Sequence, residues 1–177
     1  MTLIVCSLRL LDETIAARAP SHLVSLLSPA EMIEEHQLMS GGRHLRVRVN
    51  DIVEPAEGLT APDEQMVQDI LEFGRSWSGE QPIVIHCWAG ISRSSATAFI
   101  LACQRNPDTP ELEIARHIRA VSPVAHPNAR LVALADAAMG RQGRMVEALQ
   151  AIGPGEPAFE NEPFDIPLVF APSNPAP

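Results

Sequence analysis

The sequence predicts a single-domain α/β protein with a mostly parallel central sheet of about four to five strands flanked by helices. Short apolar or alternating runs are separated by helical patterns in the first half of the chain. Strands that alternate with helices are typical of a parallel sheet covered on both faces. The chain has 177 residues, of which 46% are hydrophobic, and this is enough to bury one core.

Four segments have the length and apolar content of β-strands. Each is short and is either apolar or alternates between apolar and polar residues: Leu3–Ser7, His22–Leu27, Leu45–Val49 and Ile83–His86. Because parallel strands all end at the same edge of a sheet, we expect the loops that follow these segments to meet there.

Helical patterns separate the predicted strands. Leu11–Arg18 and Pro29–Gln37 fit short helices, the second with Ser28 as its cap and proline at its first position. A capping-box pattern over Thr60–Asp63 predicts the start of a longer helix that continues toward Trp77. This helix would lead the chain into the last predicted strand.

The second half of the chain is predicted to be helical. After a helix from Ile91 to about residue 104, the pattern predicts helices over Pro110–Ala120, Asn128–Met139 and Val146–Ile152. We therefore place the folded domain at residues 1–153. Residues 154–177 form a proline-rich acidic tail, whose apolar residues within 164–170 favour docking against the domain.

Charge and hydropathy exclude several classes of partner. A net charge of −9 and a pI near 5.1 argue against nucleic acid, because binding a phosphate backbone needs clustered basic side chains. The first residues lack the basic start of a signal peptide, and no apolar run is long enough to cross a membrane. We expect a cytoplasmic protein without a membrane partner, and the sequence leaves the oligomeric state open.

The cysteines predict reduced thiols. Cys6, Cys87 and Cys103 are odd in number and lack paired spacing, which disfavours both a disulfide framework and a structural zinc site. The sequence also lacks a cluster of typical metal ligands, so we expect no metal and no cofactor.

The sequence His-Cys-Trp-Ala-Gly-Ile-Ser-Arg-Ser occupies residues 86–94, between a predicted strand and a predicted helix. Such a loop directs free N–H groups and the positive end of the helix dipole at one point, where an oxyanion fits. The composition alone would produce this spacing of Cys, Gly, Arg and Ser by chance in roughly one sequence in a thousand. The pattern therefore predicts an anion-binding loop.

Two side chains of this loop suggest chemistry. A positive field that holds phosphate also stabilises a thiolate, so Cys87 is the candidate nucleophile. The guanidinium of Arg93 can bind two oxygens of a phosphoryl group at once. Gly90 would allow the backbone to turn close to the anion, while the backbone amides come from Trp88, Ala89, Ile91 and Ser92.

Residues Cys87–Ser94 resemble the signature of the cysteine-dependent protein tyrosine and dual-specificity phosphatase superfamily. Val49–Ile52 and Ser122–Asn128 look like segments of a bacterial dual-specificity-like group within it. The resemblance covers roughly residues 1–150 and is strongest at the loop. It implies a tyrosine-phosphatase-like fold and phosphomonoester hydrolysis through a cysteinyl-phosphate intermediate.

The resemblance also implies supporting roles. Ser94 would hydrogen-bond the departing thiolate, although a serine in the first turn of a helix is an equally ordinary reading. His86 must point away from Cys87 on a strand, and the family likeness makes it a brace for the loop. Asn128 would steady the loop or simply cap the next helix, and Arg130 is a weaker candidate.

The leaving group of a phosphate ester needs a proton, and we assign this role to Asp51. Asp51 directly follows the predicted strand Leu45–Val49, so it lies at the same edge of the sheet as the Cys87 loop. Glu54 and Glu57 share its segment and compete for the role. Asp63 is better explained as part of a helix-capping box.

The predicted substrate is a phosphorylated protein or a small phosphomonoester. The loop side chains at 88, 89, 91 and 92 include no basic residue, which disfavours polyphosphorylated lipids. The alternatives are a rhodanese-like sulfurtransferase, which would have no use for Asp51, and a non-catalytic phosphate-binding adaptor. Trp88 could line the entrance or be buried.

Overall fold

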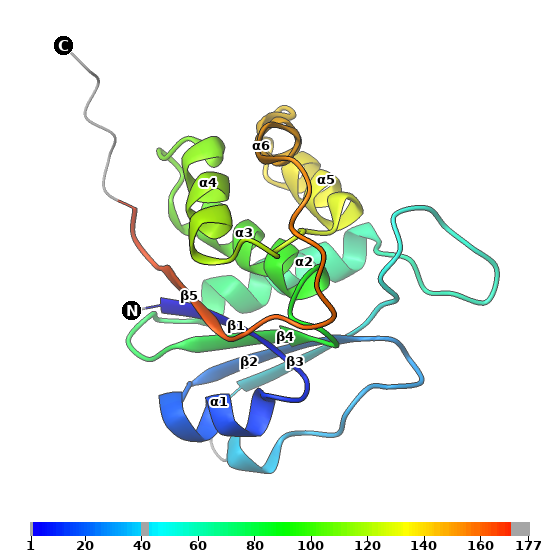
Figure 1. Ribbon diagram of the computed structural model, residues 1–177, viewed down its shortest axis with the longest axis vertical. Coiled ribbons are helices and arrows are strands. Elements are labelled where there is room, and N and C mark those ends of the chain that lie inside the picture. The colour runs from blue at the N-terminus through cyan, green and yellow to red at the C-terminus, as the bar shows by residue number, and fades with distance from the viewer. Residues whose placement is uncertain (1, 40–42, 171–177) are drawn as a thin grey trace.

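A five-stranded β-sheet with strand order β3-β2-β4-β1-β5 lies at the centre of the protein (Figure 1). The structure is a computed structural model and describes residues 2–39 and 43–170. Its strands are β1 (Thr2–Ser7), β2 (His22–Leu27), β3 (Arg43–Arg48), β4 (Ile83–Cys87) and β5 (Phe164–Pro167). Strands β1 to β4 are mutually parallel, and β5 pairs antiparallel with β1. The predicted α/β class with a mostly parallel sheet is confirmed.

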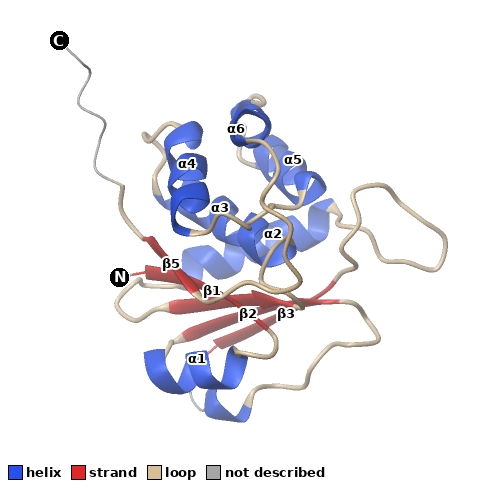
Figure 2. Ribbon diagram, in the orientation of Figure 1, coloured by secondary structure: helices blue, strands red, loops and turns tan. Residues whose placement is uncertain are grey.

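Helices cover both faces of the sheet (Figure 2). One face carries α1 (Leu11–Arg18) and the short 3₁₀ helix η1 (Gln37–Met39). The other carries the five remaining helices, which are α2 (Glu64–Ser76), α3 (Arg93–Arg105), α4 (Glu111–Val121), α5 (Ala129–Ala138) and α6 (Arg144–Ile152). Within the described residues, no helix is long and apolar enough to cross a membrane.

The two faces divide the core by the alternation of strand side chains. In β4, Ile83, Ile85 and Cys87 belong to the large cluster beneath α2 to α6. Val84 belongs to the small cluster beneath α1. This register places Cys87 on the helix-rich face and its neighbour His86 on the opposite face, as a strand requires.

The predicted helix over Pro29–Gln37 is wrong. Only a single turn forms there, in which the Glu31 N–H donates to the Ser28 carbonyl at 3.0 Å. The Ser28 hydroxyl donates to the Glu31 carboxylate at 2.5 Å instead of accepting from the backbone. Most of the segment is exposed or only partly buried, and a short helix without a buried face is unstable.

The start of α2 also differs from the prediction. Asp63 itself is the N-cap, and its carboxylate accepts from the Met66 N–H at 2.9 Å. A capping box beginning at Thr60 therefore does not form. An aspartate directly before the first apolar turn satisfies the same free N–H groups with one residue.

The segment after α6 returns to the sheet and forms β5, a strand that the sequence analysis did not predict. Figure 1 shows it running from α6 to the end of β4 and then along the edge of the sheet. Phe164 and Ile166 are buried, whereas Asp165 between them is exposed. A strand of only four residues that ends in proline is at the shortest length at which alternation indicates a strand, so the pattern is weak.

Candidate active site

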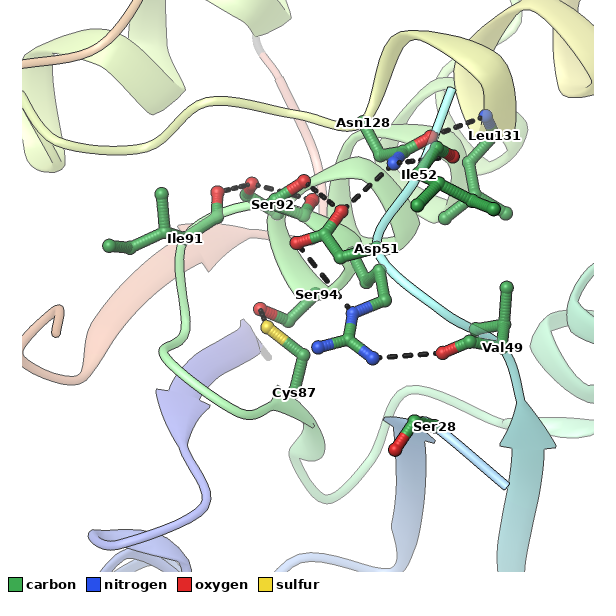
Figure 3. Close-up of polar contacts among 12 residues, drawn as sticks. Ser28, Val49, Asp51, Ile52, Cys87, Ile91, Ser92, Ser94, Asn128 and Leu131 are labelled. Carbon is green, nitrogen blue, oxygen red and sulfur yellow. Dashed lines mark hydrogen bonds and ion pairs between the residues drawn. The ribbon is translucent and has the colours of Figure 1, made fainter. Parts of the chain in front are cut away.

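The loop between β4 and α3 joins the candidate nucleophile to the candidate clamp. Cys87 is the last residue of β4 and Arg93 is the first residue of α3. Both are buried, and the Cys87 Sγ lies 3.1 Å from the Ser94 Oγ (Figure 3). The structure thus brings together three of the predicted catalytic residues at the carboxyl edge of the sheet.

The five carbonyl groups of residues 88–92 are all tied to segments outside the loop. Their donors come from the end of β1, from the segment before α5 and from the segment before β5. The bonds run from the Leu8 N–H to the Trp88 carbonyl at 3.1 Å, from the Asn161 N–H to Ala89 at 2.9 Å, from the Asn161 Nδ2 to Gly90 at 3.1 Å, from the His126 N–H to Ile91 at 2.9 Å and from the Asn128 N–H to Ser92 at 3.2 Å.

These bonds fix the direction of the loop amides. In a planar trans peptide the carbonyl and the following N–H point in opposite directions, and the described residues include no cis peptide. Because the carbonyls of residues 88–92 are held outward, the N–H groups of residues 89–93 point away from the bracing segments. In the described part of the chain, no hydrogen bond is donated by the N–H groups of residues 89–92. The loop is therefore a preformed set of donors for an oxyanion.

Gly90 is required by both its conformation and its surroundings. Its φ of +73° lies in the left-handed region, where a side chain is strained. A Cβ at this position would lie 2.9 Å from the backbone of Cys6 and Ser7 in β1. The loop can press against β1 only because residue 90 lacks a side chain.

The guanidinium of Arg93 has hydrogen-bond donors that the described residues only partly fill. Its Nη1 donates to the Val49 carbonyl at 2.8 Å, directly after β3. Its buried Nε has no hydrogen-bond partner among the described residues, and the nearest carboxylate oxygen, Oδ2 of Asp51, lies 3.8 Å away. The edge formed by Nε and Nη2 is the one that binds an oxyanion with two parallel hydrogen bonds.

Asp51 lies beside the loop, as its position after β3 predicts. Its Oδ1 accepts from the Ser92 Oγ at 2.7 Å and from the Asn128 Nδ2 at 2.9 Å (Figure 3). The side chain is 38% exposed, so it reaches the surface of the site. Glu54 and Glu57 are exposed, and neither lines the pocket that contains Cys87.

Asn128 combines the two roles that the sequence left open. Its Oδ1 caps α5 by accepting from the Leu131 N–H at 3.1 Å. Its Nδ2 holds Asp51, and its backbone N–H holds the Ser92 carbonyl. Arg130 does not reach the loop, because it donates to the carbonyls of Pro62 and Val53.

His86 lies behind the loop, on the face away from Cys87. Its Nε2 is 2.6 Å from the Ser25 Oγ, and the same hydroxyl is 2.7 Å from the Nε2 of His44. Burial lowers the pKa of His86 to about 3, and burial followed by the charge of Arg46 lowers the pKa of His44 to about 4. The pair is therefore neutral near pH 7, which suits a brace better than a proton carrier.

The site opens into a pocket of about 350 Å³. Cys87, Arg93 and Asp51 line it together with Trp88 and Phe159, among others. Trp88 is 55% exposed, so it stands at the entrance rather than in the core. Arg93 is the sole basic side chain among the described residues that line this pocket, which gives it one strong anion-binding group.

The other two cysteines differ from Cys87 in their surroundings. Both Cys6 and Cys103 are fully buried and line no pocket that holds Arg93. Burial raises the pKa of the Cys6 thiol to about 12 and raises that of Cys103 as well. Among the described residues, no group of three or more His, Cys, Asp or Glu side chains is placed to hold a metal ion.

Asn161 is a site residue that sequence reasoning missed. It comes from the segment before β5 and is 7% exposed. Its backbone N–H and side-chain amide bind two adjacent carbonyls of the loop, 71 residues away along the chain in the case of Gly90. A single asparagine in a proline-rich acidic segment carries no local signal of such a contact.

No family model and no curated protein matches the chain. Solved structures do match it. DUSP15 is 17% identical with a TM-score of 0.60, and the match covers 85% of this chain and 89% of that one. Human DUSP28 is 19% identical with a TM-score of 0.57, covering 85% and 95%. PTPMT1 in complex with PI(5)P is 12% identical with a TM-score of 0.58, covering 85% and 92%.

The similarity in each case extends over most of both chains, so it concerns the whole domain rather than the loop alone. At this level of identity, the comparison concerns the path of the backbone. The protein therefore has the fold of the dual-specificity phosphatases.

Proposed function

We propose that this protein hydrolyses phosphomonoesters through a cysteinyl-phosphate intermediate, with a phosphorylated protein or a small aryl or alkyl phosphate as its substrate. The observation that carries the proposal is the placement of the Cys87 sulfur beneath a loop whose free N–H groups and Arg93 face one pocket. An anionic nucleophile can approach a dianionic phosphate only where such a positive, preorganised site lowers the repulsion.

In the first step, the Cys87 thiolate attacks phosphorus and the bond from phosphorus to the ester oxygen breaks. The loop amides and the free edge of Arg93 bind the three non-bridging oxygens. Asp51, at the rim of the pocket, donates a proton to the departing oxygen. The alcohol or phenol leaves, and the phosphoryl group stays on sulfur.

In the second step, water attacks phosphorus and the bond from phosphorus to sulfur breaks. Asp51, now a carboxylate, accepts the proton of the attacking water. The Ser94 hydroxyl, 3.1 Å from Sγ, donates a hydrogen bond to the departing thiolate. Inorganic phosphate leaves, and the enzyme returns to its starting state.

The position of Asp51 favours hydrolysis over the two alternatives. A sulfurtransferase transfers sulfur to a thiol-type acceptor and needs no acid at the rim. A binding-only adaptor needs the amides and Arg93 but neither Cys87 nor Asp51. Because the pocket contains all of these groups, catalysis accounts for more of the site.

The decisive experiment replaces the nucleophile. The Cys87→Ser variant should lose hydrolysis of p-nitrophenyl phosphate while it still binds inorganic phosphate, measured by calorimetry. Cys103→Ser is the matched control, because this buried cysteine lies in α3 away from the pocket, and it should keep its turnover. Turnover that persists in Cys87→Ser would refute the mechanism. Phosphate binding without turnover in the wild type would favour an adaptor.

The identity of the acid is tested with Asp51→Asn. The amide keeps an oxygen that can accept from Ser92 and Asn128, so the loop should stay in place. We expect phenyl phosphate hydrolysis to fall roughly 10²- to 10⁴-fold. The loss should be smaller for p-nitrophenyl phosphate, whose leaving group departs without a proton. Equal rates for Asp51→Asn and wild type, with a loss in Glu54→Gln or Glu57→Gln, would move the role to that glutamate.

A further inference from the structure

The segment before β5 holds the anion-binding loop through one residue. The Asn161 N–H donates to the Ala89 carbonyl at 2.9 Å, and its Nδ2 donates to the Gly90 carbonyl at 3.1 Å. The same Nδ2 also donates to the Ser122 Oγ at 2.8 Å, which fixes the orientation of the amide. All three bonds are made by a residue that is 7% exposed.

Because peptide bonds are planar, the contacts of Asn161 also set the direction of the neighbouring loop N–H groups. The peptide that carries the Ala89 carbonyl also carries the Gly90 N–H, and the peptide of the Gly90 carbonyl carries the Ile91 N–H. In trans peptides these N–H groups point away from Asn161. Asn161 therefore fixes the direction of two of the five loop N–H groups, one through its backbone and one through its side chain.

The centre of the loop depends on this support more than its ends do. Trp88 directly follows β4, and Ser92 directly precedes α3, so regular structure restrains both ends. Gly90 has a left-handed conformation, in which a glycine peptide can rotate at little cost. Without an external donor, the peptide planes at Ala89 and Gly90 could turn their carbonyls toward the anion.

We propose that Asn161 is a positioning residue for the anion-binding loop, so that the segment before β5 is an essential part of the site rather than a tail. The inference deepens the proposed function, because it concerns the same pocket. It concerns phosphate affinity and the reactivity of the Cys87 thiol as well as turnover, and the first two properties can be measured without any turnover.

The chain offers a matched control in Asn106. This residue is 6% exposed and fastens the same C-terminal segment, because its Nδ2 donates to the Leu168 carbonyl at 3.0 Å. Its Oδ1 accepts from the Phe170 N–H at 2.9 Å. Asn106 lies at the far end of α3 from the loop. Asn161→Ala and Asn106→Ala should therefore both loosen the segment, but only the first should disturb the loop.

The experiment compares wild type, Asn161→Ala and Asn106→Ala by three measurements. We expect kcat/KM for p-nitrophenyl phosphate to fall roughly 10- to 100-fold in Asn161→Ala, because misplaced groups in a site cost about this much. Calorimetry should show weaker binding of inorganic phosphate, and iodoacetamide should alkylate Cys87 more slowly at a fixed pH. Asn106→Ala should lower Tm but leave all three properties near wild type.

A further variant protects the test against poor folding of Asn161→Ala. Ser122→Ala removes the partner that orients the Asn161 amide but leaves its bond to Gly90, so it should shift the same three measurements in the same direction by less. Wild-type phosphate affinity and alkylation in both Asn161→Ala and Ser122→Ala would overturn the inference. An inactive wild type with these two properties still altered in Asn161→Ala would refute the proposed hydrolysis alone.

Discussion

Two buried arginines in this protein have opposite surroundings. Arg93 in the candidate site is 6% exposed and Arg141, between α5 and α6, is 7% exposed. Arg141 donates to the Glu111 carboxylate at 3.0 Å and to the carbonyls of Cys103 and Pro107 at 2.6 and 3.2 Å. Arg93 donates to one carbonyl, and its Nε has no hydrogen-bond partner within the described structure. Burial alone therefore does not distinguish the two arginines, whereas the unpartnered Nε of Arg93, which lines the pocket with Cys87, does.

The charges around the two side chains differ in the same way. Glu111 is 5% exposed and also accepts from the Arg144 Nε at 3.1 Å, so the charge of Arg141 is balanced inside the fold. Asp51 lies 3.8 Å from the Arg93 Nε and is partly exposed. Because a buried charge is costly without a partner, a dianion that enters the pocket would complete the surroundings of Arg93 and leave those of Arg141 unchanged.

Arg93→Ala is expected to have the largest effect and to act on activity. Loss of an anion-binding donor should lower kcat/KM for p-nitrophenyl phosphate by roughly 10²- to 10³-fold or more. Tm should change little, since the hydrogen bond that holds this side chain among the described residues is to the Val49 carbonyl, and its nearest carboxylate, Asp51, is 3.8 Å away and partly exposed. A variant with near-normal kcat/KM and a strongly lowered Tm would show that Arg93 is structural and would remove the contrast.

Arg141→Ala should show the reverse pattern. The substitution removes a hydrogen-bond donor from the buried Glu111 carboxylate and from two carbonyl groups, although Arg144 still contacts the carboxylate. We expect the free energy of unfolding to fall by about 3 kcal/mol, measured by urea denaturation. The folded fraction should keep a normal kcat/KM per active site, titrated by Cys87 alkylation. A catalytic defect in fully folded Arg141→Ala would contradict the division between the two arginines.

The same contrast explains what the sequence could predict. Residues 86–94 are contiguous, so their spacing specified the loop, and the end of the third predicted strand placed Asp51 at the same edge. The satisfied state of Arg141 depends on Glu111, thirty residues away in sequence, and Asn161 contacts a carbonyl 71 residues away. Neither contact leaves a local pattern. The helix predicted over Pro29–Gln37 failed for a related reason: its capping pattern is local, but none of its residues is fully buried against the rest of the fold.

The smallest predicted effect concerns His86, which lies behind the Arg93 loop and is uncharged near pH 7. Arg141, in contrast, is held by its ion pair with Glu111. His86 has a folded pKa of about 3 against an ordinary value of 6.5, so the unfolded chain binds more protons between these values. Stability should therefore fall as the pH drops from 6.5 toward 3, by about 2 kcal/mol between pH 7 and pH 5 from this residue. Urea denaturation at both pH values should show the loss in wild type and a smaller loss in His86→Gln. An equal loss in both proteins would mean that His86 is not held neutral by the fold, and that the loop is braced without it.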